Sequence, residues 1–182
     1  VDAVNITGST KNNIVVDFAD QASILWAGNF TETAANGGAV GGSRTATLTG
    51  DTFIAGVTNG NPFTPTTHYT VSGVPAGLTA VLTKTSSTVA TLTFTGAATT
   101  HLSANDVANV TVTFVSGVFT STTTAANVTN YTDAAGVIDF VDQASIIYSG
   151  SFAESITDDG SLTGSRVANL TDDTFVAVLT EG

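Results

Sequence analysis

The residues that could bind a metal ion are carboxylates that recur in two sets along the chain. The first set is Asp17, Asp20 and Glu32, and the second, at the same spacing, is Asp139, Asp142 and Glu154. Hard cations such as Ca²⁺ bind several carboxylate and carbonyl oxygens held in loops. These acids are therefore a candidate calcium site. The alternative is that they are solvated loop residues, since the chain has no Asp-x-Asp-x-Asp-Gly loop.

The other residue types that carry catalysis are sparse or isolated. His68 and His101 have no second His or Cys at ligand spacing, and the chain has no cysteine. The Gly-x-Ser-x-Gly and His-Glu-x-x-His motifs are absent, as is any Gly-rich phosphate loop. We therefore expect a protein that is not an enzyme and that requires no cofactor other than calcium.

Two pairs of side chains occupy equivalent places and are candidates for an interface. Trp26 is matched by Tyr148, and Arg44 is matched by Arg166. The aromatic pair fits a core position, a domain interface or a carbohydrate platform. The arginines fit a bridge to a carboxylate or carbonyl, or a contact with a neighbouring unit.

These matches belong to one long repeat. Residues 17–24 (DFADQASI) return as 139–146 (DFVDQASI), an offset of 122 residues that holds without a gap to Gly60 and Gly182. Close to half of the paired residues are identical. The chain therefore contains one whole unit and about half of another. Duplication at this scale indicates an array of building blocks.

The composition excludes some kinds of binding partner and favours one cellular location. The chain has 15 acidic and four basic residues, for a net charge of −11. Nucleic acid binding needs several Lys or Arg contacts to phosphate, so we do not expect it. We also expect no membrane insertion, because every apolar run is short. The absence of Cys and Met and the abundance of Thr, Gly, Ala and Asn are typical of an extracellular β protein.

The hydrophobic pattern has the period of two that β-strands require. In residues 89–95, Leu92 and Phe94 alternate with threonines, and residues 110–114 follow the same pattern. Many short strands between Gly, Pro and Asn turns predict a β-sandwich with Greek-key connections. Ser103 and Asp106 predict one helical turn between the sheets. The expected strands are 13–18, 22–27, 43–49, 52–58, 68–73, 79–84, 88–95, 108–115 and 126–129.

Domain boundaries are expected at the two Asp-Gln pairs, which resemble short polar linkers between strands. Residues 1–21 would end a preceding repeat, 22–142 would form a complete sandwich, and 143–182 would open the next repeat. The alternative boundary lies near Gly60. The half repeat would be completed by further chain or by another copy, because exposed strand edges attract partners.

Several stretches resemble a known class of repeats. They are 69–79 (YTVSGVPAGLT), 90–98 (ATLTFTGAA), 105–114 (NDVANVTVTF) and 16–20 (VDFAD). They are similar to the immunoglobulin-like tandem repeats of large bacterial surface proteins, which act as adhesins, stalks or filaments. Phe30-x-Glu32 with Asn36-Gly37-Gly38 also resembles the opening of a Calx-β domain, which would imply calcium binding through Glu32 and Asp51.

The resemblance implies antiparallel Greek-key β-sandwich units of the immunoglobulin-like type, arranged in tandem at a bacterial cell surface. We expect a structural repeat that acts as a spacer or as a self-associating filament unit through head-to-tail contacts. Its partners would be neighbouring repeats or other copies of the chain. The alternative is an adhesin module that binds a glycan or a protein of a host surface.

Overall fold

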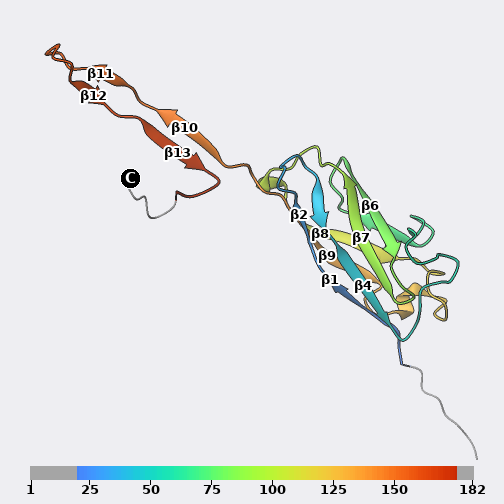
Figure 1. The fold of residues 1–182 in the computed structure, drawn as a ribbon. Coiled ribbons are helices and arrows are strands. Elements are labelled where there is room, and N and C mark those ends of the chain that lie inside the picture. Colours follow the sequence, from blue (N-terminus) through green and yellow to red (C-terminus); the bar gives the residue numbers. More distant parts are fainter. Residues whose placement is uncertain (1–19, 176–182) are drawn as a thin grey trace, which may run out of the picture.

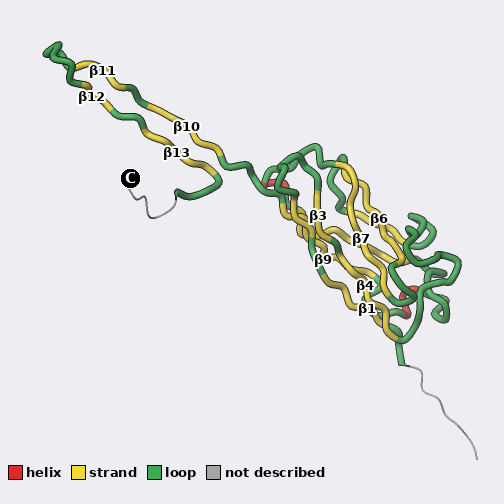
Figure 2. Tube along the Cα trace, in the orientation of Figure 1, coloured by secondary structure: helices red, strands yellow, loops and turns green. Residues whose placement is uncertain are grey.

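Strands account for nearly all regular structure in residues 20–175, the part of the chain that this computed structural model describes (Figure 1). The helical residues form two short 3₁₀ turns, η2 (Ser103–Asn105) and η3 (Ala125–Asn127) (Figure 2). The predicted all-β class with antiparallel sheets is therefore confirmed. Strands β1 to β9 form a two-sheet body within residues 20–142, and β10 to β13 extend away from it (Figure 1).

The first sheet of the body has four strands in the order β1-β4-β7-β6, and every neighbouring pair is antiparallel. In β7 the predicted alternation is present, because Leu92 and Phe94 are buried while the threonines between them are partly exposed. β-Branched threonine suits the wet face of a pleated strand. The strands are β1 (Ser23–Ala27), β4 (Arg44–Thr49), β6 (Leu78–Lys84) and β7 (Val89–Gly96).

The second sheet has five strands in the order β3-β2-β9-β8-β5. All pairs are antiparallel except β2 and β9, which run parallel with Phe30 opposite Ile138. The strands are β2 (Phe30–Glu32), β3 (Val40–Gly42), β5 (Tyr69–Ser72), β8 (Val107–Phe114) and β9 (Thr132–Asp139).

Residues 23–49, which we call the first hairpin, contribute to both sheets. β1 and β4 pair in the first sheet, while β2 and β3 pair in the second. The chain changes sheet at Gly28 and again at Gly42, whose φ values are +94° and +83°. A Cβ at Gly28 would clash with the Ser43 carbonyl, so glycine is required there for both conformation and space.

The inward side chains of both sheets form one apolar core. Phe30 of β2 packs edge-on against Phe94 of β7 with ring centroids 4.7 Å apart, which joins the two sheets. A second aromatic group surrounds Phe114 of β8, with Phe53 at 5.3 Å and Phe119 at 5.7 Å between centroids. Burying each of these rings contributes about 1.5–3 kcal/mol of stabilisation.

Two predicted strands are wrong. Residues 52–58 form a loop in which the Lys84 ammonium donates to the carbonyls of Phe53 (3.3 Å) and Ile54 (2.6 Å). Residues 126–129 overlap η3, and the strand that closes the second sheet is β9 instead. Both segments have apolar, β-branched residues, but they form only isolated bridges, Phe53 with Phe119 and Thr129 with Ser23, rather than a continuous ladder.

The predicted helical turn is confirmed, and it fixes the end of the body. η2 lies beside the chain as it leaves β9. The Asp106 carboxylate accepts a hydrogen bond from the Phe140 N–H at 2.8 Å, and the Asp142 carboxylate accepts one from the Ser103 N–H at 3.0 Å. Phe140 itself is buried in the core.

Asp51 lies just after the C-terminal end of β4, where it links the loop at residues 51–52 to the loop at residues 121–122. Its carboxylate accepts hydrogen bonds from the backbone N–H groups of Thr52 (2.7 Å), Ser121 (3.0 Å) and Thr122 (2.7 Å). Partial burial raises the pKa of Asp51, but these hydrogen bonds lower it more, so the net pKa lies below its ordinary value of 3.8. The fold therefore favours the ionised carboxylate.

We predict that Asp51→Asn flattens the acid limb of the stability curve. The folded pKa is below the unfolded pKa, so the stabilisation from Asp51 is present above the unfolded pKa and is lost as pH falls through the folded value. Asn lacks the charge, and near neutral pH we expect a loss of about 1–2 kcal/mol. Denaturant unfolding between pH 7 and pH 2.5 measures both effects. An unchanged pH slope in the variant would contradict this role.

Candidate functional site

The extended strands form a second hairpin, residues 145–171, that repeats the first at the 122-residue offset. Its strands are β10 (Ser145–Ser149), β11 (Phe152–Glu154), β12 (Leu162–Gly164) and β13 (Val167–Thr171). The pairing register is the same in both copies. Ile24 lies opposite Leu48 as Ile146 lies opposite Leu170, and Phe30 lies opposite Gly42 as Phe152 lies opposite Gly164.

The turns of the two hairpins also have the same backbone conformations. Gly28 and Gly150 have φ values of +94° and +85°, and Asn36 and Asp158 have values of +43° and +48°. The Glu154 carboxylate accepts a hydrogen bond from the Gly160 N–H at 2.9 Å, as Glu32 does from Gly38 at 2.6 Å. The two hairpins therefore share one backbone conformation, although strands of the body cover only the first.

The hairpins differ in what covers their inward face. Ile24 and Phe30 are each 1% exposed, whereas Ile146 is 46% and Phe152 is 59% exposed. Among residues 20–175, no hydrogen bond joins the second hairpin to the body. A two-stranded hairpin by itself is only marginally stable in water. This uncovered apolar face is the candidate functional surface.

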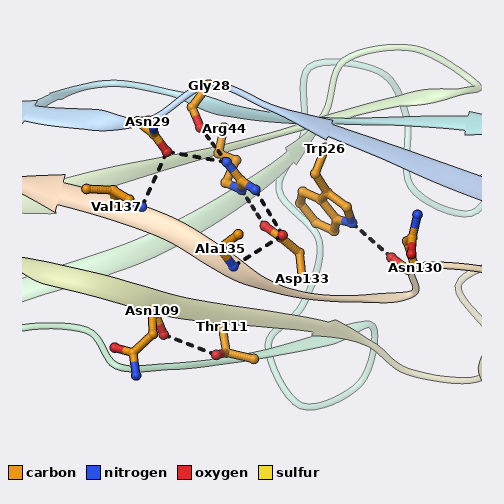
Figure 3. Close-up of polar contacts among 10 residues, drawn as sticks. All are labelled: Trp26, Gly28, Asn29, Arg44, Asn109, Thr111, Asn130, Asp133, Ala135 and Val137. Atoms are coloured by element: carbon orange, nitrogen blue, oxygen red, sulfur yellow. Dashed lines mark hydrogen bonds and ion pairs between the residues drawn. The ribbon is translucent and has the colours of Figure 1, made fainter.

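In the first hairpin, the inward face carries one buried ion pair, made by Arg44. Its guanidinium forms a two-pronged ion pair with Asp133 on β9, with Nη2 2.9 Å from Oδ1 and a second contact between Nε and Oδ2 (Figure 3). Its Nη1 donates to the Gly28 carbonyl at 2.6 Å. Arg44 and Asp133 are both buried, and they join the two sheets because β4 and β9 belong to different sheets.

Arg166, the counterpart of Arg44, is exposed on the second hairpin. Its guanidinium carbon lies 5.4 Å from the centre of the Tyr148 ring, a cation–π contact within the hairpin itself. Within the described residues it makes no ion pair. The charge that pairs with a carboxylate in the first copy therefore faces solvent in the second.

Trp26 lies within the body rather than between units. Its ring stacks on Phe114 at 5.6 Å, and its Nε1–H donates to the Asn130 carbonyl at 2.9 Å (Figure 3). Of the four candidate interface residues, Trp26 and Arg44 thus contact other parts of their own domain. Tyr148 and Arg166 lie on the uncovered hairpin.

The buried Glu32 carboxylate is occupied by protein donors. It accepts hydrogen bonds from the Gly38 N–H at 2.6 Å and the Val141 N–H at 3.2 Å, and His101 Nδ1 lies 3.0 Å from Oε1. Its place at the exit from β9 explains why an acid is needed there. The Glu32 side chain is fully shielded from water, and these hydrogen bonds compensate for the burial of its carboxylate.

The other acids of the calcium hypothesis are spread along the chain. Asp20, Asp139 and Glu154 are exposed, Asp142 accepts a hydrogen bond from the Ser103 N–H of η2, and Asp17 lies outside the described residues. Residues 20–175 contain no group of three or more His, Cys, Asp or Glu side chains arranged to hold a metal ion. Asp51, which the Calx-β resemblance implicates, binds backbone N–H groups instead. Calcium binding stays a prediction.

A shallow groove runs between β5 and β6, the strands that end the two sheets on the same side of the body. It has a volume of about 460 Å³ and is lined mainly by apolar groups, among them Pro65, Val71, Val74 and Leu78. Edge strands with unpaired backbone groups are places where another chain can add. The groove is therefore a second surface that could bind a partner.

Comparison of this chain with protein-family models, with curated proteins and with solved structures finds no match. In residues 20–175, no helix has the length and apolar character needed to cross a membrane.

Sequence reasoning identified Arg44 and Arg166 but not Asp133, which completes the ion pair. The two residues are 89 positions apart, and β9 was not among the expected strands. A signal was present in the strong match between residues 15–18 and residues 137–140, because the strand expected at 13–18 predicts a second one at the same offset, near 135–140. The partner of an inward arginine has to lie on a strand of the facing sheet.

We predict that Arg44→Met destabilises the body by about 3–5 kcal/mol, because it leaves the Asp133 carboxylate buried without its partner. The double variant Arg44→Met with Asp133→Leu should recover most of that loss, since no unpaired charge remains. Equilibrium unfolding in urea of the parent, the Arg44→Met and Asp133→Leu single variants and the double variant measures the four free energies needed for a double-mutant cycle.

Arg166→Met is the matched control, because it removes the same side chain from the uncovered copy. We expect a change within about 0.5 kcal/mol. Equal effects of the substitutions at residues 44 and 166 would show that the ion pair does not hold the sheets together.

Proposed function

We propose that this chain is a structural repeat of an extracellular bacterial surface protein, in which two-sheet units follow one another at intervals of 122 residues. In this role each unit serves as a spacer, or as a building block of a filament, through contacts between successive units. The observation that carries the proposal is the second hairpin, which repeats the strand pairing and register of the first at the 122-residue offset.

The strand order supports an immunoglobulin-like Greek-key β-sandwich. Labelled A to G in the usual way, β1, β4, β7 and β6 correspond to A, B, E and D, and β5, β8 and β9 correspond to C, F and G. The first strand divides between the sheets at Gly28, so that β2 pairs with the last strand β9. Sandwiches of this kind have their two chain ends at opposite poles, which suits a linear array.

The described units follow each other through a short connection. β9 ends at Asp139 and β10 begins at Ser145, and Phe140 is still part of the body core. Figure 1 shows the second hairpin continuing away from the pole opposite to that where β1 begins. Units joined by so few free residues extend along one direction rather than folding back on each other.

The composition supports an exterior location. A chain with 15 acidic and four basic residues carries a strong negative field, which keeps extended particles apart in solution. The lack of Cys and Met leaves no thiol or thioether to oxidise. The resemblance to bacterial surface repeats points to the same compartment.

One observation favours a second function, binding of a protein ligand. The apolar groove lies beside Val71 of β5 and Leu78 of β6, the strands at the ends of the two sheets. An extended peptide can add to such an edge through main-chain hydrogen bonds. Because Trp26 stacks on Phe114, this groove suits the adhesin alternative better than a carbohydrate platform on Trp26.

We predict that concatenated units form a rod. Proteins with one, two and three copies of residues 21–142 in direct succession should show a maximum dimension that grows by a constant increment, measured by small-angle X-ray scattering. A short interdomain linker and like-charged units both favour extension.

A particle whose maximum dimension grows much less than its mass would contradict the proposal, because units that collapse on each other cannot act as spacers. Residues 21–142 alone are the control for independent folding. Limited proteolysis of the full chain should preserve this body and cut within residues 143–182, since exposed segments are cleaved first.

A further inference from the structure

We propose that the second hairpin is a half-site that binds one defined occupant, namely strands equivalent to β5–β9 from another unit of this repeat that has no first hairpin of its own. This inference rests on the proposed function, which makes the hairpin the opening of a second unit. It adds the identity of the partner and the charge that the partner must carry.

The first hairpin shows what the occupant has to match. Six buried side chains of the first copy have an identical residue at the equivalent place in the second. The pairs are Ile24 and Ile146, Phe30 and Phe152, Arg44 and Arg166, Ala46 and Ala168, Leu48 and Leu170, and Phe53 and Phe175. In the body these residues contact β7, β8 and β9 and the loops beside them. A surface that reproduces those strands therefore fits the second hairpin.

The second hairpin already has the geometry of the covered one. Its register and its left-handed residues match those of the first hairpin, even though no strand within residues 20–175 covers its inward face. Binding to a preformed surface costs less conformational entropy than binding coupled to folding. The exposed Ile146 and Phe152 thus present a ready-made template.

Charge restricts the occupant further. Arg44 is buried against the Asp133 carboxylate, so covering the second hairpin buries Arg166 and requires an acid at the equivalent place. By the 122-residue offset, the residue of the N-terminal segment that matches Asp133 is Lys11, which lies outside the described residues. A cation there would repel Arg166, so that segment does not meet the requirement.

Stoichiometry excludes simple exchange between two copies of this chain. The described residues contain two hairpins but one set of strands β5–β9, and that set is covered by the first hairpin. If the second hairpin of one copy displaced the first hairpin of another, one inward face would still be left uncovered. Exchange therefore yields no net burial, and the occupant must come without a hairpin.

The repeat also defines the experiment. Gly182 matches Gly60, so the strands that complete the second unit correspond to residues 61–142. The first protein to test is the full chain with a second copy of residues 61–142 joined directly after Gly182. We expect the amides of β10 and β13 to gain protection from hydrogen exchange equal to that of β1 and β4, with a second cooperative unfolding transition.

Two adjacent isoleucines provide a matched pair of variants. Ile146 faces inward like the buried Ile24, whereas Ile147 faces outward like Leu25, which is 71% exposed. In the joined protein, Ile146→Asp should abolish the new protection and Ile147→Asp should preserve it. Arg166→Asp should also abolish it, and the reversed charge, Asp→Arg in the appended copy of Asp133, should restore it in part.

The strands of residues 61–142 can also be supplied as a separate fragment, which tests binding without a covalent connection between the two parts. The full chain is refolded together with a fragment of residues 61–142, and a 1:1 complex is expected in size-exclusion chromatography. Arg166→Glu in the full chain should weaken this complex by about 100-fold, as expected when one partner of a buried charge pair is lost.

Three results would overturn the proposal. One is an unchanged exchange rate of the second hairpin in the joined protein together with no complex in the separate mixture. Another is an equal effect of Ile146→Asp and Ile147→Asp. The third is a dimer of the full chain that protects residues 145–171 without the fragment, which would make a second free hairpin the occupant.

The two proposals fail in different measurements: the array proposal in the scattering of concatenated units, and the half-site proposal in the hydrogen exchange of the joined protein. Concatenated units that collapse would leave the completed hairpin protected, whereas an unfilled half-site would leave the concatenated rods intact.

Discussion

The structure depends on covering one apolar face, because the first hairpin supplies strands to both sheets. Its inward residues Ile24, Phe30 and Leu48 lie in the same core as Leu92 and Ile138 from the strands that cover them. The Arg44–Asp133 ion pair fixes the place where the sheets meet, because a buried guanidinium tolerates few alternative positions for its carboxylate. Apolar burial stabilises the packing of the two sheets, and the ion pair fixes the position of β4 relative to β9.

The second hairpin presents the same chemistry without its cover. The same sequence pattern builds the same strands and turns, but Phe152 and Arg166 face solvent. Apolar surface of this kind marks a binding site in a folded protein. The molecule is therefore organised around a division of each unit into a hairpin and the strands that enclose it.

The repeat pattern identified the acidic residues, but only the tertiary structure revealed what their carboxylates bind. Glu32 and Asp142 were noticed because they recur at the repeat offset, and hard-cation chemistry was the natural hypothesis for them. In the structure, each binds a backbone N–H near the end of the body. Such contacts depend on which loops meet in space, and residues more than 30 positions apart along the chain carry no local signal of that meeting.

The sequence by itself determined the 122-residue repeat, the all-β class and most strands of the first sheet, because alternation and turn residues act within a few positions. It misplaced a strand at 52–58, where Lys84 binds the backbone carbonyls, and it did not reveal Asp133 as the partner of Arg44. The sequence predicted an incomplete second unit, but only the tertiary structure decided which side chains are buried in the first hairpin and exposed in its copy. Local sequence sets the shape of a hairpin, whereas burial depends on strands contributed from elsewhere.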